Sequence, residues 1–258
     1  SSVTEVVVLS ALLAGFLWNA AMTKIGMPVS ASHALIGSLI GASVAYGGTG
    51  ILNIKGLSKI FTSLLVSPVL GIVLGFIFMK LVLKFFGYYS PGAVNKYFGR
   101  LQLISSGFMA FSHGSNDAQK VMGIITLSLV SGGYLHSVEV PFWVIFLCAL
   151  AMGLGTAFGG WRVIKTMGVH MLKLEPVHGF AAETSATAII LGAGALGLPV
   201  STTHVISTAI MGVGATKRLS AVRWGIAQKI VMAWIFTLPV CALVAWGACE
   251  GLLVIFPK

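Results

Sequence analysis

Long apolar runs recur along the whole chain, and several approach the roughly 20 residues that an α-helix needs to cross a bilayer. The runs cover residues 3–22, 60–83, 101–112, 118–130, 140–158, 185–198 and 224–256. Hydrophobic residues make up 57% of the chain and charged residues 9%, which is outside the range of soluble domains. The alternating pattern of a membrane barrel is absent. The sequence therefore predicts an all-α, multi-pass integral protein of the cell membrane, with the lipid bilayer as its surroundings.

The net charge of +10 does not indicate a nucleic-acid partner. Most lysines and arginines cluster at the ends of the predicted helices and not along one helix face, so they act as topology signals. No ATP-binding or nucleophile motif occurs in the chain. We therefore expect no enzyme activity and no cofactor, and an ion gradient is the expected source of energy.

One segment of the sequence occurs twice, 171 residues apart. PVSASH at residues 28–33 matches PVSTTH at residues 199–204. The same offset aligns Gly26 with Gly197, Gly41 with Gly212, and Pro68-Val69 with Pro239-Val240. A single offset that holds over more than forty residues indicates duplicated structure.

Basic clusters predict the orientation of the two copies. Lys80, Lys84, Lys96 and Arg100 precede the segment 101–132, and Arg162, Lys165 and Lys173 follow the helix predicted at 140–160. Two crossings separate these clusters, so both lie on the cytoplasmic side under the positive-inside rule.

The second copy of the repeated segment is followed by a piece too short to span a membrane. The 13 residues of 204–216 make about 20 Å of helix, against a hydrocarbon core of about 30 Å. We therefore expect a re-entrant helical hairpin with its tip at 199–204. The helix from Arg223 then runs opposite to its repeat partner at about 57–84. Inverted repeats with two re-entrant hairpins and broken transmembrane helices are typical of secondary transporters that work by alternating access.

Both predicted hairpin tips carry hydroxyl groups at the start of a helix. Pro199 ends the preceding helix, and Ser201 or Thr202 can cap the next one. Ser30 and Ser32 repeat the arrangement in the first copy. The N–H groups and partial positive charge of a helix N-terminus suit an anion, so we expect a compact tetrahedral oxyanion to bind here.

Asp117 and Glu183 are the acidic residues that fall well inside apolar segments. Placing a carboxylate inside a membrane has a high free-energy cost, so such residues indicate a functional site. The segment 111–123 is predicted to be an unwound stretch of helix, where freed carbonyls and Asp117 would bind a cation. Alternatively Asp117 pairs with Lys120 one turn on, or Lys120 neutralises an anion. For Glu183, a cation ligand, a proton carrier and a gate stay open.

The segments SHGSNDAQK, HGFAAETSA, PVSASHALIG and PVSTTH together resemble the inorganic phosphate transporter (PiT) family over the length of the chain. The resemblance implies symport of inorganic phosphate with sodium or protons. Carried over to this chain, the expected phosphate ligands are Ser30, Ala31, Ser32, Asn116, Ser201, Thr202 and Thr203. The expected cation ligands are Ser115, Asn116, Asp117 and Glu183, with sodium at Asp117, and Glu183 matches a family glutamate associated with transport.

The repeat predicts the domain organisation. Repeat 1 covers residues 1–86, a cytoplasmic connector 87–100, and repeat 2 residues 101–258, with a broken Asn-Asp helix at 101–132. The family has an Asn-Asp motif in each repeat, and the partner of Asn116-Asp117 would fall before Ser1. We therefore expect that the first part of repeat 1 is absent from the chain as given, which could then not transport on its own. A permease for another oxyanion such as sulfate, an uncoupled anion channel, and a homo-oligomer stay open.

Overall fold

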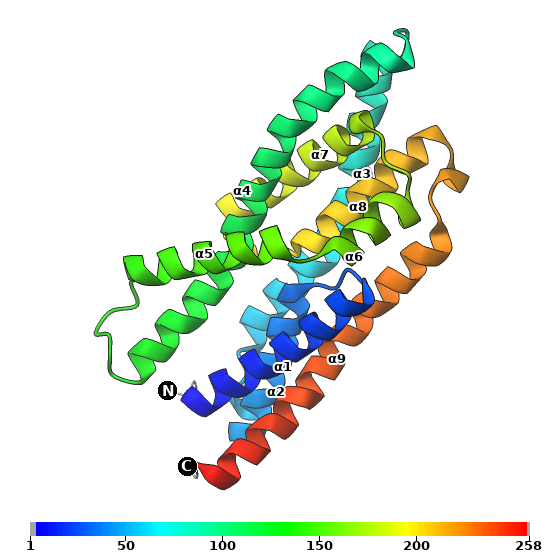
Figure 1. The fold of residues 1–258 in the computed structure, drawn as a ribbon. Coiled ribbons are helices and arrows are strands. Elements are labelled where there is room, and N and C mark those ends of the chain that lie inside the picture. The colour runs from blue at the N-terminus through cyan, green and yellow to red at the C-terminus, as the bar shows by residue number, and fades with distance from the viewer. Residues whose placement is uncertain (1–3, 257–258) are drawn as a thin grey trace. The chain divides into compact units, whose positions relative to one another are not determined.

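The computed structural model describes residues 4–256, and the regular elements within that range are all helices (Figure 1). The α-helices are α1 (Glu5–Ile25), α2 (Ala31–Gly47), α3 (Ile54–Phe86), α4 (Pro91–Ser131), α5 (Phe142–Phe158), α6 (Trp161–Lys165), α7 (Pro176–Ala195), α8 (Thr202–Lys217) and α9 (Trp224–Ile255). Shorter elements are the 3-10 helices η1 (Thr49–Ile51) and η3 (Leu219–Ala221) and the π-helix η2 (Thr166–Met171). The predicted all-α class is confirmed.

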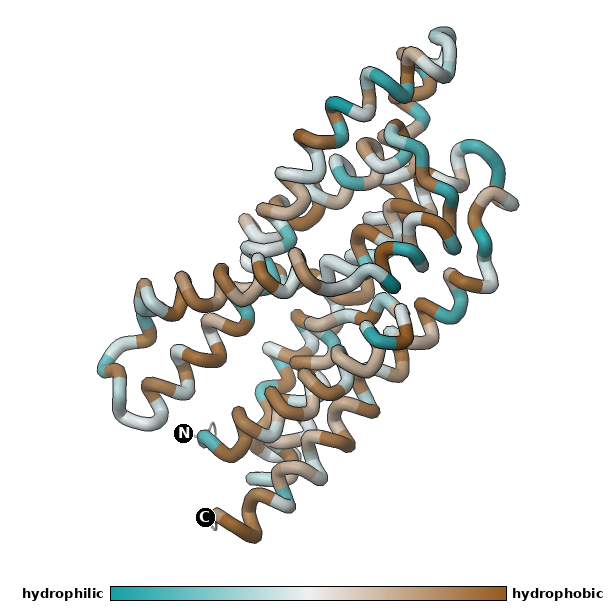
Figure 2. The backbone as a smooth tube through the Cα atoms, in the orientation of Figure 1, coloured by the Kyte–Doolittle hydropathy of each residue, from teal (hydrophilic) through white to brown (hydrophobic). Residues whose placement is uncertain are grey.

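Three of these helices, α1, α3 and α9, are long and apolar enough to cross a membrane. Apolar residues predominate along them, as the brown colouring in Figure 2 shows. A fourth candidate span is a bent pair formed by α5 and the segment Trp161–Met171. The pair is interrupted at Gly159 and Gly160, and Gly160 has a φ of 85°, a left-handed conformation that suits glycine. The chain is thus a multi-pass helical membrane protein.

Two pairs of helices form hairpins, α1 with α2 and α7 with α8. A glycine with positive φ follows the first helix of each pair: Gly26 (φ 87°) caps α1, and Gly197 (φ 62°) lies in the turn two residues after the end of α7. The N–H of Gly26 donates to the carbonyls of Met22 and Thr23, which closes the last turn of α1. These two glycines are aligned at the 171-residue offset, so the repeat extends to backbone conformation.

The chain divides into two compact units that do not coincide with the two sequence repeats. Unit 1 comprises residues 1–57, 117–160 and 232–258, and unit 2 comprises residues 58–116 and 161–231. The first hairpin lies in unit 1 and the second in unit 2. Helices α4 and α9 each contribute residues to both units.

Close contacts at glycines explain why each unit combines segments from both sequence repeats. In unit 1, a Cβ on Gly37 would come within 2.5 Å of the Leu238 carbonyl oxygen, so α2 lies directly against α9. In unit 2, a Cβ on Gly75 would come equally close to the Ala209 carbonyl oxygen, so α3 lies directly against α8. Each hairpin therefore packs on the long proline-containing helix of the other repeat.

We expect Gly41→Ala to destabilise unit 1. An added Cβ would overlap the carbonyl group of Ala242 on α9, so α2 and α9 would have to separate. Overpacking of this kind costs about 1–3 kcal/mol, which thermal unfolding in detergent measures. The matched control is Gly251→Ala on α9, where a Cβ meets nothing within 4 Å. Equal melting temperatures for the two variants would contradict the close approach.

The predicted break at 111–123 is wrong, because α4 is a continuous helix from Pro91 to Ser131. The polar side chains of this stretch find partners without unwinding the backbone. Ser112 Oγ donates to the Met109 carbonyl, and Asp117 pairs with Lys120 one turn later. The backbone carbonyls of this stretch are consequently used within the helix and are not exposed as cation ligands.

The predicted connector at 87–100 includes the beginning of a helix. Helix α4 begins at Pro91, so residues 91–100 are helical. Proline suits the first position of a helix, because its missing N–H would have no intrahelical partner there. The observed break in a candidate span lies instead between α5 and α6.

Candidate functional site

The two hairpin tips have the same capping geometry. Ser30 precedes α2 with φ −89° and ψ 112°, and Ser201 precedes α8 with φ −89° and ψ 110°. Each Oγ accepts a hydrogen bond from the backbone N–H three residues on, His33 at 3.1 Å and His204 at 3.2 Å. The predicted cap at Ser201 is confirmed, and the two tips are structural copies of one another.

The hydroxyl groups at both tips are buried. Ser30, Ser32, Ser201 and Thr202 are all between 0% and 3% exposed. The first N–H groups of a helix have no intrahelical acceptor, and they carry the positive end of the helix dipole. A buried helix start lined with hydroxyls can therefore donate several hydrogen bonds to an anion, as the sequence predicts.

In unit 2, α4 contributes a side chain to the hairpin tip. Asn116 Nδ2 donates to the Val200 carbonyl at 3.2 Å, immediately before the Ser201 cap. The structure thus brings Asn116 together with the second tip, where Thr203 is half-buried in the first turn of α8. Ser115 precedes Asn116 on α4 and is also half-buried.

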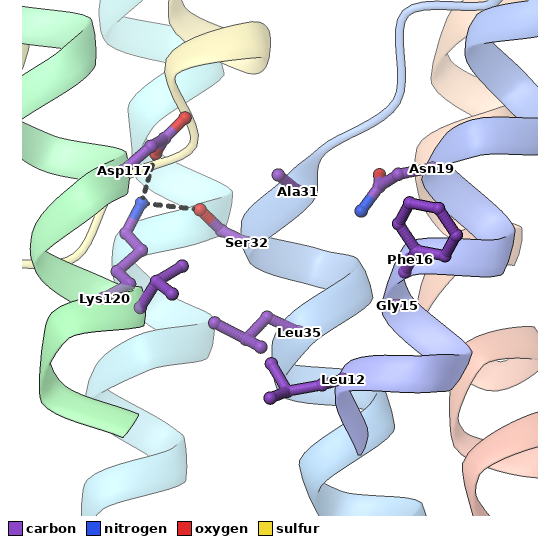
Figure 3. A pocket seen from close by; sticks show the side chains of 10 residues that line it. Leu12, Gly15, Phe16, Asn19, Ala31, Ser32, Leu35, Asp117 and Lys120 are labelled. Atoms are coloured by element: carbon purple, nitrogen blue, oxygen red, sulfur yellow. Dashed lines mark hydrogen bonds and ion pairs between the residues drawn. The ribbon is translucent and has the colours of Figure 1, made fainter. Parts of the chain in front are cut away.

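In unit 1, a lysine joins α4 to the first tip. Lys120 Nζ lies 2.8 Å from Asp117 Oδ1 and donates to Ser32 Oγ at 2.7 Å (Figure 3). Of the alternatives that the sequence leaves open, pairing of Asp117 with Lys120 is the one observed. The contact with Ser32 was not predicted, because it joins residues that are 88 positions apart.

A pocket of about 210 Å³ opens beside this group of three residues. Asp117, Lys120 and Ser32 line one part of it, and Ala31 and Asn19 line another (Figure 3). The remaining wall is apolar and includes Leu12, Phe16, Leu35 and Val121. Polar groups from α1, α2 and α4 therefore share a largely apolar cavity within unit 1.

A tryptophan holds the first tip in place, which the sequence did not reveal. Trp234 Nε1 donates to the Pro28 carbonyl at 2.9 Å, and this bond is buried. At the 171-residue offset Trp234 corresponds to Ser63, which has no indole N–H to donate. Since the repeat is imperfect here, comparing the two copies could not predict the bond.

Glu183 lies away from the second tip. Its Oε2 accepts from Ser105 Oγ at 2.6 Å, and its Oε1 accepts a long hydrogen bond of 3.5 Å from Gln102 Nε2. Ser105 lies about 16 Å from Asn116 along the axis of α4, at 1.5 Å per residue. The structure therefore does not bring Glu183 together with Asn116. Gln102 and Ser105 were missed, although two polar residues at helical spacing in an apolar run were a signal for them.

Known proteins resemble this chain over most of its length. Residues 1–92 and 87–245 match the phosphate transporter family. A protein of Bacillus subtilis (strain 168) named as a probable low-affinity inorganic phosphate transporter is 46% identical over 239 residues, which cover 92% of this chain and 72% of the relative. A protein of the same name from Rhizobium meliloti (strain 1021) is 46% identical over 244 residues, covering 94% and 73%.

The fold also matches that of a solved structure. The structure, described as the sodium-dependent phosphate transporter, has a TM-score of 0.87 and 26% sequence identity to this chain. The match covers 97% of this chain and 80% of the other. Together with the sequence relatives, this likeness establishes the family. The chain belongs to the phosphate transporter family.

Proposed function

We propose that this protein is a cation-coupled symporter that carries inorganic phosphate across the membrane by alternating access. The observation that carries the proposal is the pair of hairpin tips, each a capped helix start with buried hydroxyl groups. Such a tip offers several hydrogen-bond donors and a partial positive charge, which suits a small oxyanion. The names of the sequence relatives support phosphate as that oxyanion.

The proposed phosphate ligands fall into one group in each unit. In unit 1 they are Ser30, Ala31 and Ser32, and in unit 2 they are Asn116, Ser201, Thr202 and Thr203. We further propose that both hairpins are re-entrant and that the repeats are inverted. Helix α8 has 16 residues, about 24 Å, and so is shorter than a hydrocarbon core of about 30 Å.

Coupling to cations follows from the cost of moving the anion. Carrying divalent phosphate into a negative-inside cell costs about 4.6 kcal/mol per 100 mV. Two monovalent cations cancel that charge, and a third ion or a chemical gradient allows accumulation. The sodium dependence of the matching solved structure supports sodium over protons. Ser115 and Asn116 remain proposed cation ligands on α4, and Glu183 remains a separate proposed ligand on α7. The role of Asp117 depends on its contact with Lys120.

Uptake of labelled phosphate into proteoliposomes that contain the full-length protein tests the proposed function. We expect uptake above equilibrium that requires an inward cation gradient, and replacing sodium by choline at fixed pH distinguishes sodium from protons. A twentyfold excess of sulfate is expected to leave the rate nearly unchanged, on the order of a 10% loss, if the site discriminates by hydrogen bonding to a protonated phosphate oxygen. Strong inhibition by sulfate would favour a general oxyanion permease. Uptake that never exceeds equilibrium would indicate a channel.

A further inference from the structure

The cation beside Asp117 is a side chain of the protein, the ammonium group of Lys120. The Lys120 ammonium contacts Asp117 Oδ1 at 2.8 Å and Ser32 Oγ at 2.7 Å. A carboxylate and a hydroxyl are oxygen ligands of the kind that hard cations bind. The ammonium is a compact positive charge, and it takes both of these oxygens at hydrogen-bond distance.

The backbone around Asp117 offers little to a second cation. Hard cations in proteins take several oxygen ligands, often including carbonyls released from regular structure. Helix α4 is continuous through this stretch, so its carbonyls stay within the helix. A sodium ion at Asp117 would therefore have few further backbone ligands, and it would stand beside a like charge.

The surroundings strengthen the pair formed by Lys120 and Asp117. The two side chains are 18% and 13% exposed, so water screens them less than it screens a surface ion pair. Lys120 also connects two elements, because Asp117 lies on α4 and Ser32 lies in the first turn of α2. The pair lines the cavity that Figure 3 shows, and Asn19 on α1 lines another part of its wall.

We propose that the Lys120 ammonium is a tethered cation that occupies the position at Asp117 and Ser32 where the sequence predicts a sodium ion. Asp117 then binds no coupling ion while this contact is closed. The lysine neutralises the carboxylate, and Ser32 can still donate its own hydroxyl proton to an anion while its oxygen accepts from Lys120. This inference rests on the proposed symport, and it refines which residues of that transporter bind sodium.

Replacing Lys120 by glutamine tests the proposal, because it removes the tethered charge and leaves Asp117 in place. The measurement is the ratio of phosphate uptake rates in sodium and in choline at fixed pH. We expect this ratio to rise at least about fivefold in Lys120→Gln. Fivefold is the lower end of the range by which one bound ligand, here sodium, typically changes the affinity for another, here phosphate. Lys120→Arg keeps the charge and should keep the wild-type ratio. The double variant Lys120→Gln with Asp117→Asn should return to the wild-type ratio, because the new sodium ligand is gone.

A second measurement does not depend on transport. Thermal unfolding of the purified proteins in sodium chloride and in choline chloride, at equal concentration, reports sodium binding directly. Sodium should raise the melting temperature of Lys120→Gln more than that of the wild type or the double variant. An equal sodium response in Lys120→Gln and wild type would overturn the proposal, as would an equal loss of uptake in both salts with no change in the ratio. If the full-length wild type takes up no phosphate, the proposed function fails, while the unfolding experiment still decides the role of Lys120.

Discussion

Replacing Thr202 by valine is expected to raise the KM for phosphate by roughly 5- to 150-fold, which corresponds to about 1–3 kcal/mol. Thr202 begins α8 directly after the Ser201 cap and is 2% exposed. Valine keeps the shape of the side chain and removes the hydroxyl, so a phosphate oxygen bound there would lose its donor. The loss is large because water cannot replace the donor in a buried site.

Thr216→Val is the matched control for this substitution. Thr216 lies near the other end of the same helix, and its Oγ1 donates to the Val213 carbonyl. Its hydroxyl is about 21 Å from Thr202 along α8, so the KM should stay within about twofold of the wild type. An unchanged KM in Thr202→Val would remove Thr202 from the phosphate site.

Replacing Asn116 by leucine is expected to reduce phosphate uptake by about tenfold or more, because it leaves the buried Val200 carbonyl without its amide donor. The Val200 carbonyl directly precedes the Ser201 cap, so the loss of the Asn116 hydrogen bond loosens the second tip. The same substitution also removes a proposed phosphate donor. Both effects act on the same helix start, and we expect them to lower the rate and raise the KM together.

Asn95→Leu provides the comparison, because Asn95 is half-buried near the start of the same helix. The two variants are compared by initial rates of uptake and by thermal unfolding in detergent. Asn116→Leu should lower uptake even at temperatures well below its melting point, whereas Asn95→Leu should leave uptake close to the wild type. If Asn116→Leu transports normally, the bond to Val200 has no role in the transport cycle.

Local sequence signals predicted the helices and the hairpin tips well. The apolar runs gave the candidate spans, and the serines of the two repeated segments marked where the second helix of each hairpin begins. Ser201 caps α8 as expected, and Gly26 and Gly197 adopt the left-handed conformation that helix ends favour. These features depend on a few neighbouring residues, so they can be read from the sequence.

Contacts between distant segments explain where sequence reasoning was wrong or incomplete. Polar residues around Asp117 suggested a broken helix, but their partners are the Lys120 side chain and, for Asn116, a carbonyl on another element. Close contacts at glycines determine which long helix each hairpin packs on. The sequence around a glycine does not indicate which helix will lie against it. Glu183 was grouped with the Asn-Asp motif because both are polar in apolar surroundings. Glu183 lies on α7, however, and its partner Ser105 is about 16 Å from Asn116 along α4.

Phosphate binding at the hairpin tips is tested most directly by a cryo-EM structure determined with phosphate bound. In unit 2 we expect phosphate oxygens within about 2.7–3.2 Å of the Thr202 hydroxyl and the first N–H groups of α8. Asn116 should lie at the same site. Phosphate bound beside Glu183 and Ser105 instead, with the start of α8 unoccupied, would contradict the proposed transport site.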